Sequence, residues 1–467
     1  MSSKRSSRTL AAISGGLGLA LALAACSSGT SGGTTAASGG TTAASGGTTA
    51  ASGECAAFAA YGDLTGKKVD VYTGIVTPED QPYMDSYKPF EDCTHAKVNY
   101  VGDKAFETQI LVRAKAGNPP DIAIVPQPGL LAQLVATGAA KAAPKAVADN
   151  VDKFWGADWK SYGSVGGKFY AAPSGASVKS LVWYSPKEFT DNGYKVPTTL
   201  DEMMALTEKI AATGKKPWCA GIGSGEATGW PITDWMEEMM LRLSGPEVYD
   251  QWVTHKIAFN SAAPTAALDA VGAYLKNDKF VNGGLGDVKS IATTTFQDGG
   301  LPILDGSCSL HQMASFYASN FPKGTKVAQD GDVFAFYEPG VKASDHPVEG
   351  GGEFNLAFSD RPEVQAFQTY LSTDLWANTK AKISSTATGG GWISANKGLD
   401  VANLTNPIDK LSATILQDPK TIFRFDGSDQ MPAAIGSDAF WKQATAWITG
   451  QSTKDTVDKI EAAWPKS

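Results

Sequence analysis

Short apolar runs alternate with amphipathic helical stretches in this chain, and that order constrains the fold more than any other feature. The runs Lys68–Tyr72, Ala96–Val101 and Asp121–Val125 have the length and composition of strands. Helical spacing of apolar residues begins at Phe106 and again at Leu130. A β-α-β-α order predicts an open, largely parallel sheet with a ligand crevice beyond the carboxyl ends of its strands.

The pattern restarts in the middle of the chain. Leu181–Tyr184 has the character of a strand, and the helix after it begins with Thr199 and Glu202, which have the spacing of a capping box. We therefore expect an α/β protein of two lobes, each a mostly parallel sheet flanked by helices.

The first 26 residues have the features of an export signal. Lys4, Arg5 and Arg8 precede an apolar stretch that ends in Leu-Ala-Ala-Cys at Cys26. This ending resembles the lipobox of bacterial lipoproteins, which implies removal of residues 1–25 and lipidation of Cys26. The alternative is a cleaved protein that is freely secreted.

A low-complexity segment follows, over residues 26–54. The unit Gly-Gly-Thr-Thr-Ala-Ala-Ser begins at Gly32, Gly39 and Gly46 and offers no large apolar side chain for a core. As a flexible coil it would reach roughly 30 Å from the membrane surface. We expect a linker between a lipid anchor and a folded body on the outer face of the cytoplasmic membrane.

The net charge argues against one class of partner, and the cysteine content predicts disulfides. A net charge of -8 with no Lys/Arg stripe argues against a nucleic-acid partner. Outside the cytosol, Cys55, Cys93, Cys219 and Cys308 suggest two disulfides. Three pairings are possible, of which we favour Cys55–Cys93 and Cys219–Cys308. No Cys-x-x-Cys pair is present, so we expect neither zinc nor another metal.

Several motifs together resemble the extracellular solute-binding proteins of carbohydrate ABC transporters, most closely the α-glucoside and maltose-type branch. The resemblance covers nearly the whole chain after Glu54. Its motifs are Glu107–Ile110, Ala116–Ala123, Pro126–Leu131, Pro217–Gly225, Gly229–Trp235, Gly306–His311 and Gly389–Lys397.

This resemblance implies a periplasmic-binding-protein-like fold in which two lobes close around a sugar. Lobe 1 would comprise residues 55–176 and 347–382, and lobe 2 residues 177–346 and 383–467. A hinge crossing fits Pro173–Ser177. The implied partners are an α-glucoside and separate ABC permease subunits in the membrane, with the binding protein itself a monomer and no cofactor.

Sugar hydroxyls require carboxylate and amide partners, and the C–H faces of sugar rings require flat aromatic surface. Glu226, Trp230, Asp234 and Trp235 cluster in the sequence, and Trp392 follows three glycines that would let a ligand approach the backbone. These five residues are candidate ligand contacts.

The resemblance adds further positions. Glu107, with Asp103 just before it, matches a sugar-binding carboxylate of maltose-type relatives. Gln127 follows a strand that reaches the cleft, and Trp441 matches an aromatic platform. The chain departs from the family after Gly306, where Cys308, Ser309 and His311 replace an aromatic residue. The residue that would stack on the sugar ring from this side of the cleft is therefore undefined.

Several candidates have structural alternatives. Trp235 could be a core residue of an amphipathic helix, and Glu107 could complement a helix dipole. Asp103 could cap that helix, and His311 could be an ordinary core histidine.

Enzymatic readings have less support, and we expect no enzyme. Ser394 and Lys397 form a Ser-x-x-Lys, but Ser-Asp-Asn and Lys-Thr-Gly are absent, as is His-Glu-x-x-His. A lipidated glycoside hydrolase using Glu107 and Glu226 is the main enzymatic alternative. A polyol or a peptide is the alternative ligand.

Overall fold

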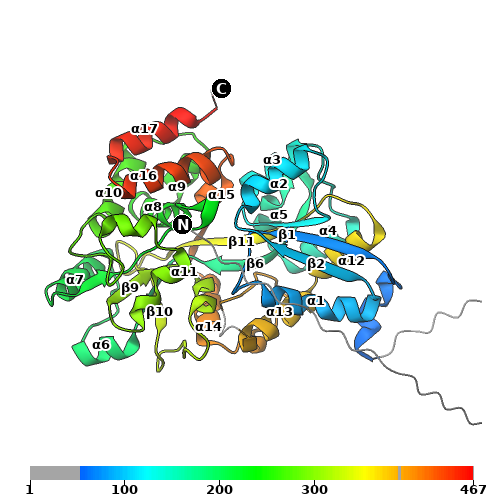
Figure 1. The fold of residues 1–467 in the computed structure, drawn as a ribbon, viewed down its shortest axis with the longest axis horizontal. Coiled ribbons are helices and arrows are strands. Elements are labelled where there is room, and N and C mark those ends of the chain that lie inside the picture. The colour runs from blue at the N-terminus through cyan, green and yellow to red at the C-terminus, as the bar shows by residue number, and fades with distance from the viewer. Residues whose placement is uncertain (1–52, 388–390, 466–467) are drawn as a thin grey trace, which may run out of the picture. The chain divides into compact units, whose positions relative to one another are not determined.

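The computed structural model describes residues 53–387 and 391–465. The expected signal peptide (1–25), the lipidation site Cys26 and the linker up to residue 52 lie outside the described residues. The predicted α/β architecture is confirmed, because two main sheets are surrounded by helices (Figure 1).

The larger sheet has six strands in the order β12-β11-β3-β1-β2, with β6 also paired to β11. The neighbours β1, β2 and β3 run parallel, as predicted, while β11 runs antiparallel to both β3 and β6. The strands are β1 (Lys68–Thr73), β2 (Lys97–Gly102), β3 (Ile122–Val125), β6 (Ala171–Val178), β11 (Pro347–Ala357) and β12 (Ile422–Phe425).

The second sheet has four strands in the order β10-β7-β9-β8. Only its β8–β9 pairing is parallel, so the expectation of two mostly parallel sheets is wrong for this one. The reason is that β9 and β10 return from distant parts of the chain to pair antiparallel with β7, an arrangement that local periodicity does not reveal. The strands are β7 (Leu181–Tyr184), β8 (Lys216–Trp218), β9 (Cys308–Gln312) and β10 (Phe334–Tyr337), and a separate hairpin joins β4 (Ser164–Val165) to β5 (Lys168–Phe169).

Helices fill most of the remaining chain. The α-helices are α1 (Gln81–Thr94), α2 (Phe106–Lys115), α3 (Pro128–Ala136), α4 (Lys145–Phe154), α5 (Ala157–Tyr162), α6 (Pro186–Asn192), α7 (Leu200–Ala211), α8 (Trp230–Ser244), α9 (Pro246–Val253), α10 (Ala262–Leu275), α11 (Phe296–Gly299), α12 (Pro362–Leu371), α13 (Asp374–Ala387), α14 (Pro407–Gln417), α15 (Gly427–Gln430), α16 (Trp441–Ile448) and α17 (Thr453–Ala463). Short 3-10 or π segments are η1 (Gly53–Tyr61), η2 (Gly225–Ala227), η3 (Val288–Ala292), η4 (Leu301–Ile303), η5 (Ser315–Asn320), η6 (Val401–Asn403) and η7 (Ile435–Phe440).

The alternation of side chains along the strands explains how the helices cover the larger sheet. In β3, Ile122 and Ile124 join the core cluster that contains Phe90 of α1, whereas Ala123 and Val125 join the opposite cluster, with residues of α2 and α3. Figure 1 shows α2 and α3 on one face of this sheet and α1 and α12 on the other. Both faces are buried, which is why β3 is apolar at every position.

The predicted positions of the first strands and helices are confirmed to within a few residues. Thr199 caps α7 as expected, because its Oγ1 accepts the Glu202 backbone N–H at 3.2 Å. The hinge crossing expected at Pro173–Ser177 stays a prediction, and in the structure this stretch lies inside β6, where it pairs with β11.

The boundaries of the two predicted lobes stay a prediction. The chain passes from the six-stranded to the four-stranded sheet between β6 and β7 and returns between β10 and β11. One detail differs from the expected ranges. Strand β12 belongs to the six-stranded sheet, although its residues fall in the segment 383–467 assigned to lobe 2.

Both favoured disulfides are present. Cys55–Cys93 joins η1 to α1 with a Cα–Cα distance of 5.2 Å, and Cys219–Cys308 joins the end of β8 to the start of β9 at 5.7 Å. The first therefore fastens the beginning of the folded body, and the second connects two neighbouring strands of the smaller sheet. In the described parts of the chain, no helix is long and apolar enough to cross a bilayer.

Candidate ligand site

A cavity of about 240 Å³ lies at the carboxyl ends of β1, β3 and β12, where the sequence predicted a crevice. This volume is slightly below the range of about 300–1,000 Å³ typical of small-molecule sites. Each strand is followed directly by residues of the cavity wall. Other parts of the wall come from residues of α1, α8, α11, α13 and η5, so segments far apart in sequence enclose the same space.

Five predicted ligand residues line this cavity: Glu107, Gln127, Trp230, Trp392 and Trp441. Glu107 lies in the first turn of α2, and the Gln127 Nε2 donates to its Oε1 at 3.4 Å. Burial raises the pKa of the Glu107 carboxyl above its usual value, and the charges of Glu226 and Asp103 act in the same direction.

The other five predicted residues are not part of the cavity wall. Asp103 lies just before α2 and accepts hydrogen bonds from the Tyr72 hydroxyl (2.6 Å) and the Ala105 backbone N–H (2.9 Å). Glu226 is exposed on η2. The carboxylate pair considered for glycoside hydrolysis, Glu107 and Glu226, is therefore not assembled in one cavity.

Trp235 and His311 lie in the core. The Trp235 indole is 3% exposed and packs against Trp218 and Tyr274, as expected for the inner face of an amphipathic helix. His311 on β9 is 1% exposed, and its Nδ1 lies 2.9 Å from the Cys219 carbonyl oxygen. Burial lowers the pKa of His311 to about 4, so this imidazole is neutral at physiological pH.

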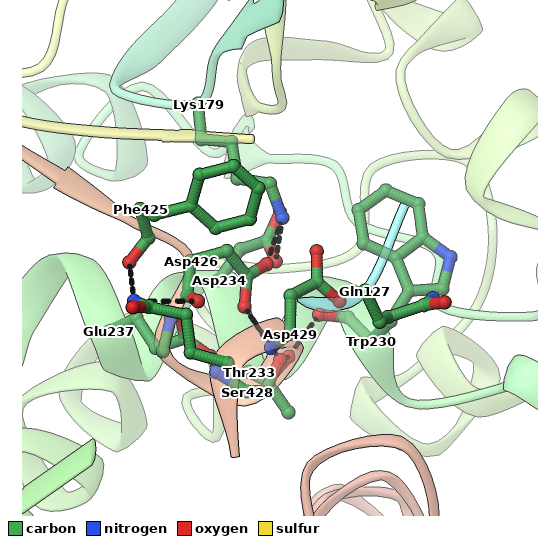
Figure 2. Close-up of polar contacts among 12 residues, drawn as sticks. Gln127, Lys179, Trp230, Thr233, Asp234, Glu237, Phe425, Asp426, Ser428 and Asp429 are labelled. Carbon is green, nitrogen blue, oxygen red and sulfur yellow. Dashed lines mark hydrogen bonds and ion pairs between the residues drawn. The ribbon is translucent and has the colours of Figure 1, made fainter. Parts of the chain in front are cut away.

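Asp234, the tenth candidate, belongs to a buried ionic group that we name the Lys179 cluster: Lys179, Asp234 and Asp426 (Figure 2). The Lys179 Nζ lies 2.9 Å from Asp234 Oδ1 and also pairs with Asp426 Oδ2. Burial opposes the charge on Lys179, but the two carboxylates hold its pKa well above the usual value. The cluster joins the end of β6, helix α8 and the end of β12.

A second set of contacts fixes the segment after β12. Glu237 of α8 accepts the backbone N–H groups of Gly427 (2.5 Å) and Ser428 (3.1 Å), while Asp426 accepts that of Asp429 (2.7 Å). In Figure 2, the Asp429 carboxylate lies between Asp426 and the pair formed by Gln127 and Trp230. Asp429 lines the cavity, and burial together with the Asp426 charge raises its pKa well above the ordinary value.

The two carboxylates of the Lys179 cluster, together with Glu349, have the spacing of a metal site. Asp234, Glu349 and Asp426 each bring one oxygen within 4.8 Å of the others. However, the Lys179 ammonium already bridges two of these three carboxylates. The positive charge that a metal ion would supply at this position therefore comes from a side chain.

Aromatic rings line part of the cavity. Trp230 lies edge-on to Phe296, with ring centroids 5.1 Å apart, and Phe316 lies 6.1 Å from the same indole. Phe296 and Phe316 were not predicted, and they supply aromatic surface that the sequence left undefined after Gly306. Their spacing along the chain matches no simple motif, since each comes from a separate short helix.

A second charged group lines the cavity, which we name the Lys380 cluster: Glu79, Tyr83, Glu353 and Lys380. The Lys380 Nζ lies 4.0 Å from the centroid of the Tyr83 ring and 5.1 Å from that of Trp392. It donates a hydrogen bond to the Ser384 Oγ at 2.9 Å. Sequence reasoning missed this cluster because its members come from α1, β11, α13 and the segment before α1, none of which carries a local ligand motif.

Several buried polar atoms of the wall have no hydrogen-bond partner among residues 53–387 and 391–465. They are the Gln127 Oε1, the Glu353 Oε2, the Trp392 Nε1 and the Trp441 Nε1. Buried polar groups are nearly always paired, and leaving one unpaired costs about 1–3 kcal/mol. A ligand with several hydroxyl groups would supply both donors and acceptors to such a wall.

Comparisons with known proteins agree with this arrangement. The profile described as "Bacterial extracellular solute-binding protein" matches residues 74–299. The α-glucosides-binding periplasmic protein AglE of Rhizobium meliloti (strain 1021) is 39% identical over 416 residues, covering 86% of this chain and 88% of the relative. The chain belongs to the bacterial extracellular solute-binding proteins. It is a non-catalytic solute-binding component of an ABC importer for sugars.

A second relative is the osmoprotective compounds-binding protein GgtB of Synechocystis, at 34% identity over 418 residues, or 88% of this chain and 96% of the relative. Solved structures confirm the fold. The galactose-binding solute receptor AcbH has a TM-score of 0.71 at 17% identity over 85% of this chain and 97% of the other. A chitin oligosaccharide binding protein has a TM-score of 0.69 at 16% identity, with the same coverage.

Proposed function

We propose that this solute-binding protein captures an α-glucoside, such as maltose, trehalose or sucrose, and delivers it to the permease of its importer. The observation that carries the proposal is the 39% identity with an α-glucosides-binding protein over 86% of the chain. The cavity supports it chemically, because carboxylates and an amide stand beside indole rings.

Within this proposal, Glu107 and Asp429 accept hydrogen bonds from sugar hydroxyls. Each carboxyl group offers two oxygens to neighbouring hydroxyls, so the two groups together fix a hydroxyl pattern. Trp230, Trp392 and Trp441 provide surface for the C–H faces of the rings. The five predicted residues outside the wall are not assigned a direct contact.

A polyol is the second candidate ligand. It is favoured by the 34% identity with a protein named for osmoprotective compounds. The hydroxyl groups of a polyol are donors and acceptors like those of a sugar, so the same carboxyl and amide groups would serve.

A calorimetric screen separates these candidates. The purified protein is titrated with maltose, trehalose, sucrose, a polyol such as glycerol and, as controls, galactose and a tripeptide. We expect saturable heat with one site per chain for at least one α-glucoside, and no conversion of the sugar. Binding to the controls alone would contradict the proposal.

We also propose that the protein captures its ligand by closure of its two lobes. The Asn320 Nδ2 on η5 lies 3.5 Å from Glu79 Oε1, a contact across the cavity of the kind that closure would form. Ligand contacts made only in the closed form would shift the population toward it.

We further propose that lipidated Cys26 attaches the protein to the membrane. Replacing Cys26 by Ala should release the protein from the membrane fraction, as measured by fractionation and immunoblotting.

A further inference from the structure

We infer that Lys380 is a ligand-contacting residue whose ammonium donates hydrogen bonds to oxygen atoms of the sugar. This inference rests on the proposed sugar site and adds a contact that no local motif of the sequence indicates. It assigns the Lys380 cluster to recognition of a hydroxyl-bearing part of the ligand.

The first argument is the incomplete pairing of this lysine. Its side chain is 2% exposed, yet among the described residues it forms no ion pair and donates one hydrogen bond, to Ser384. A lysine ammonium has three donors, and a buried cation is costly unless its donors find partners. Because Lys380 lines the cavity, the acceptors for its remaining donors can come from a ligand.

The second argument is the way in which the ammonium is held. Tyr83 and Trp392 present their rings at 4.0 and 5.1 Å, and cation–π attraction fixes the ammonium without using its N–H donors as an ion pair would. Trp392 packs edge-on against Trp376, with centroids 5.6 Å apart, which in turn restrains the indole. The group is therefore positioned in advance, which lowers the entropic cost of binding.

Carboxyl groups surround Lys380 without pairing with it. They are Glu79 from the segment before α1, Glu353 from β11 and Asp409 from α14, and the titratable Tyr83 of α1 lies with its ring against the ammonium. Burial lowers the pKa of Lys380 to about 7, and the charges of Glu353, Glu79 and Asp409 act in the opposite direction. Burial also raises the pKa of Glu79 and of Asp409 to about 7.

This environment gives the contact a measurable signature. A sugar oxygen that accepts from the ammonium stabilises the charged form of Lys380, so its pKa rises on binding. Near pH 7.5 the free protein is only partly protonated at this site, and binding should take up protons from the buffer.

The test compares Lys380→Met with Lys382→Met, using the sugar that binds most tightly in the calorimetric screen. Methionine keeps the length and apolar stem of lysine without the charge, and Lys382 is an exposed lysine on the same helix. We expect Lys380→Met to weaken binding at least about tenfold, which is the loss of one charged hydrogen bond. Lys382→Met should bind like the wild type.

Proton uptake gives a second readout that needs no variant. Titrations of the wild type at pH 7.5 in buffers of different ionisation enthalpy should show proton uptake, and Lys380→Met should lose it. Unchanged affinity in a folded Lys380→Met protein, or binding by the wild type without proton uptake, would overturn the inference. If the wild type binds another sugar but no α-glucoside, only the proposed specificity fails. Absence of binding to any sugar would overturn both.

Discussion

Lys179 and Lys380 are two buried lysines in the wall of one cavity, and they are held in different ways. Lys179 pairs with Asp234 and Asp426, while Lys380 lies against two aromatic rings and forms no ion pair among the described residues. Its nearest carboxyl groups act on it only from a distance. Lys179 thus connects two carboxylates within the fold. Lys380 keeps N–H donors that no described residue accepts.

The two lysines are both buried, so it is their ion pairing that distinguishes a charge that stabilises the fold from a charge that is available to bind a ligand. The Lys179 cluster connects β6, α8 and β12, so the placement of Asp429 depends on it. In the Lys380 cluster the cost of a buried cation is only partly offset, by carboxyl groups that form no ion pair with it among the described residues, and a site of that kind is typical of function rather than of stability.

The largest expected effect is on the stability of the Lys179 cluster. Lys179→Met leaves Asp234 and Asp426 buried without their cation, and we expect the free energy of unfolding to fall by about 3–5 kcal/mol. Lys380→Met is the matched control, and it should cost much less or stabilise the protein, because it removes an unpaired buried charge. Urea unfolding followed by tryptophan fluorescence measures both. Equal losses would remove the distinction between the clusters.

The next effect concerns the carboxylates of the cavity. Glu107→Gln preserves shape and removes the charge that strengthens a hydrogen bond from a sugar hydroxyl, so affinity should fall about tenfold or more. Glu226→Gln, on an exposed residue outside the cavity wall, should bind with wild-type affinity. Calorimetric titration with the preferred glucoside measures both variants. A larger loss in Glu226→Gln would place the sugar elsewhere.

The third effect is a pH dependence of stability that is spread over several pH units. The pKa of Lys380 is about 7 in the folded protein against an ordinary value of 10.5, so between these values the unfolded chain binds more protons. Stability attributable to this group therefore rises as pH increases from 7 to 10, by at most about 1.4 kcal/mol per pH unit.

Lys380→Met should lack this rise, whereas Lys382→Met should retain it. Urea midpoints at pH 7.5 and 9.5 give the comparison. An identical change of midpoint in the wild type and in Lys380→Met would show that Lys380 is not the group responsible.

Local patterns predicted the part of the fold that is built from neighbouring segments. Strands β1 to β3 with α2 and α3 follow from short-range periodicity, whereas the expectation of two disulfides allowed three pairings, of which the favoured one is present. The antiparallel strands β10 and β11 could not be predicted in this way, because they pair with strands about 150 to 230 residues earlier.

The same division applies to the cavity. Glu107 was predicted because it matches a motif of the family, and Gln127 because it follows a strand end within such a motif. Glu79, Glu353 and Lys380 were missed because they meet only through the tertiary fold. Trp235 lies close to the cavity in sequence but on the inner face of α8, where helix packing directs its indole into the core.

A crystal structure of the protein with its bound sugar is the most direct test of the whole account. We predict a sugar inside the cavity, with its oxygens within hydrogen-bond distance of both Glu107 and the Lys380 Nζ, while Lys179 keeps its two carboxylates. A sugar bound elsewhere, or a Lys380 ammonium that turns from the ligand to pair with Glu353, would contradict it.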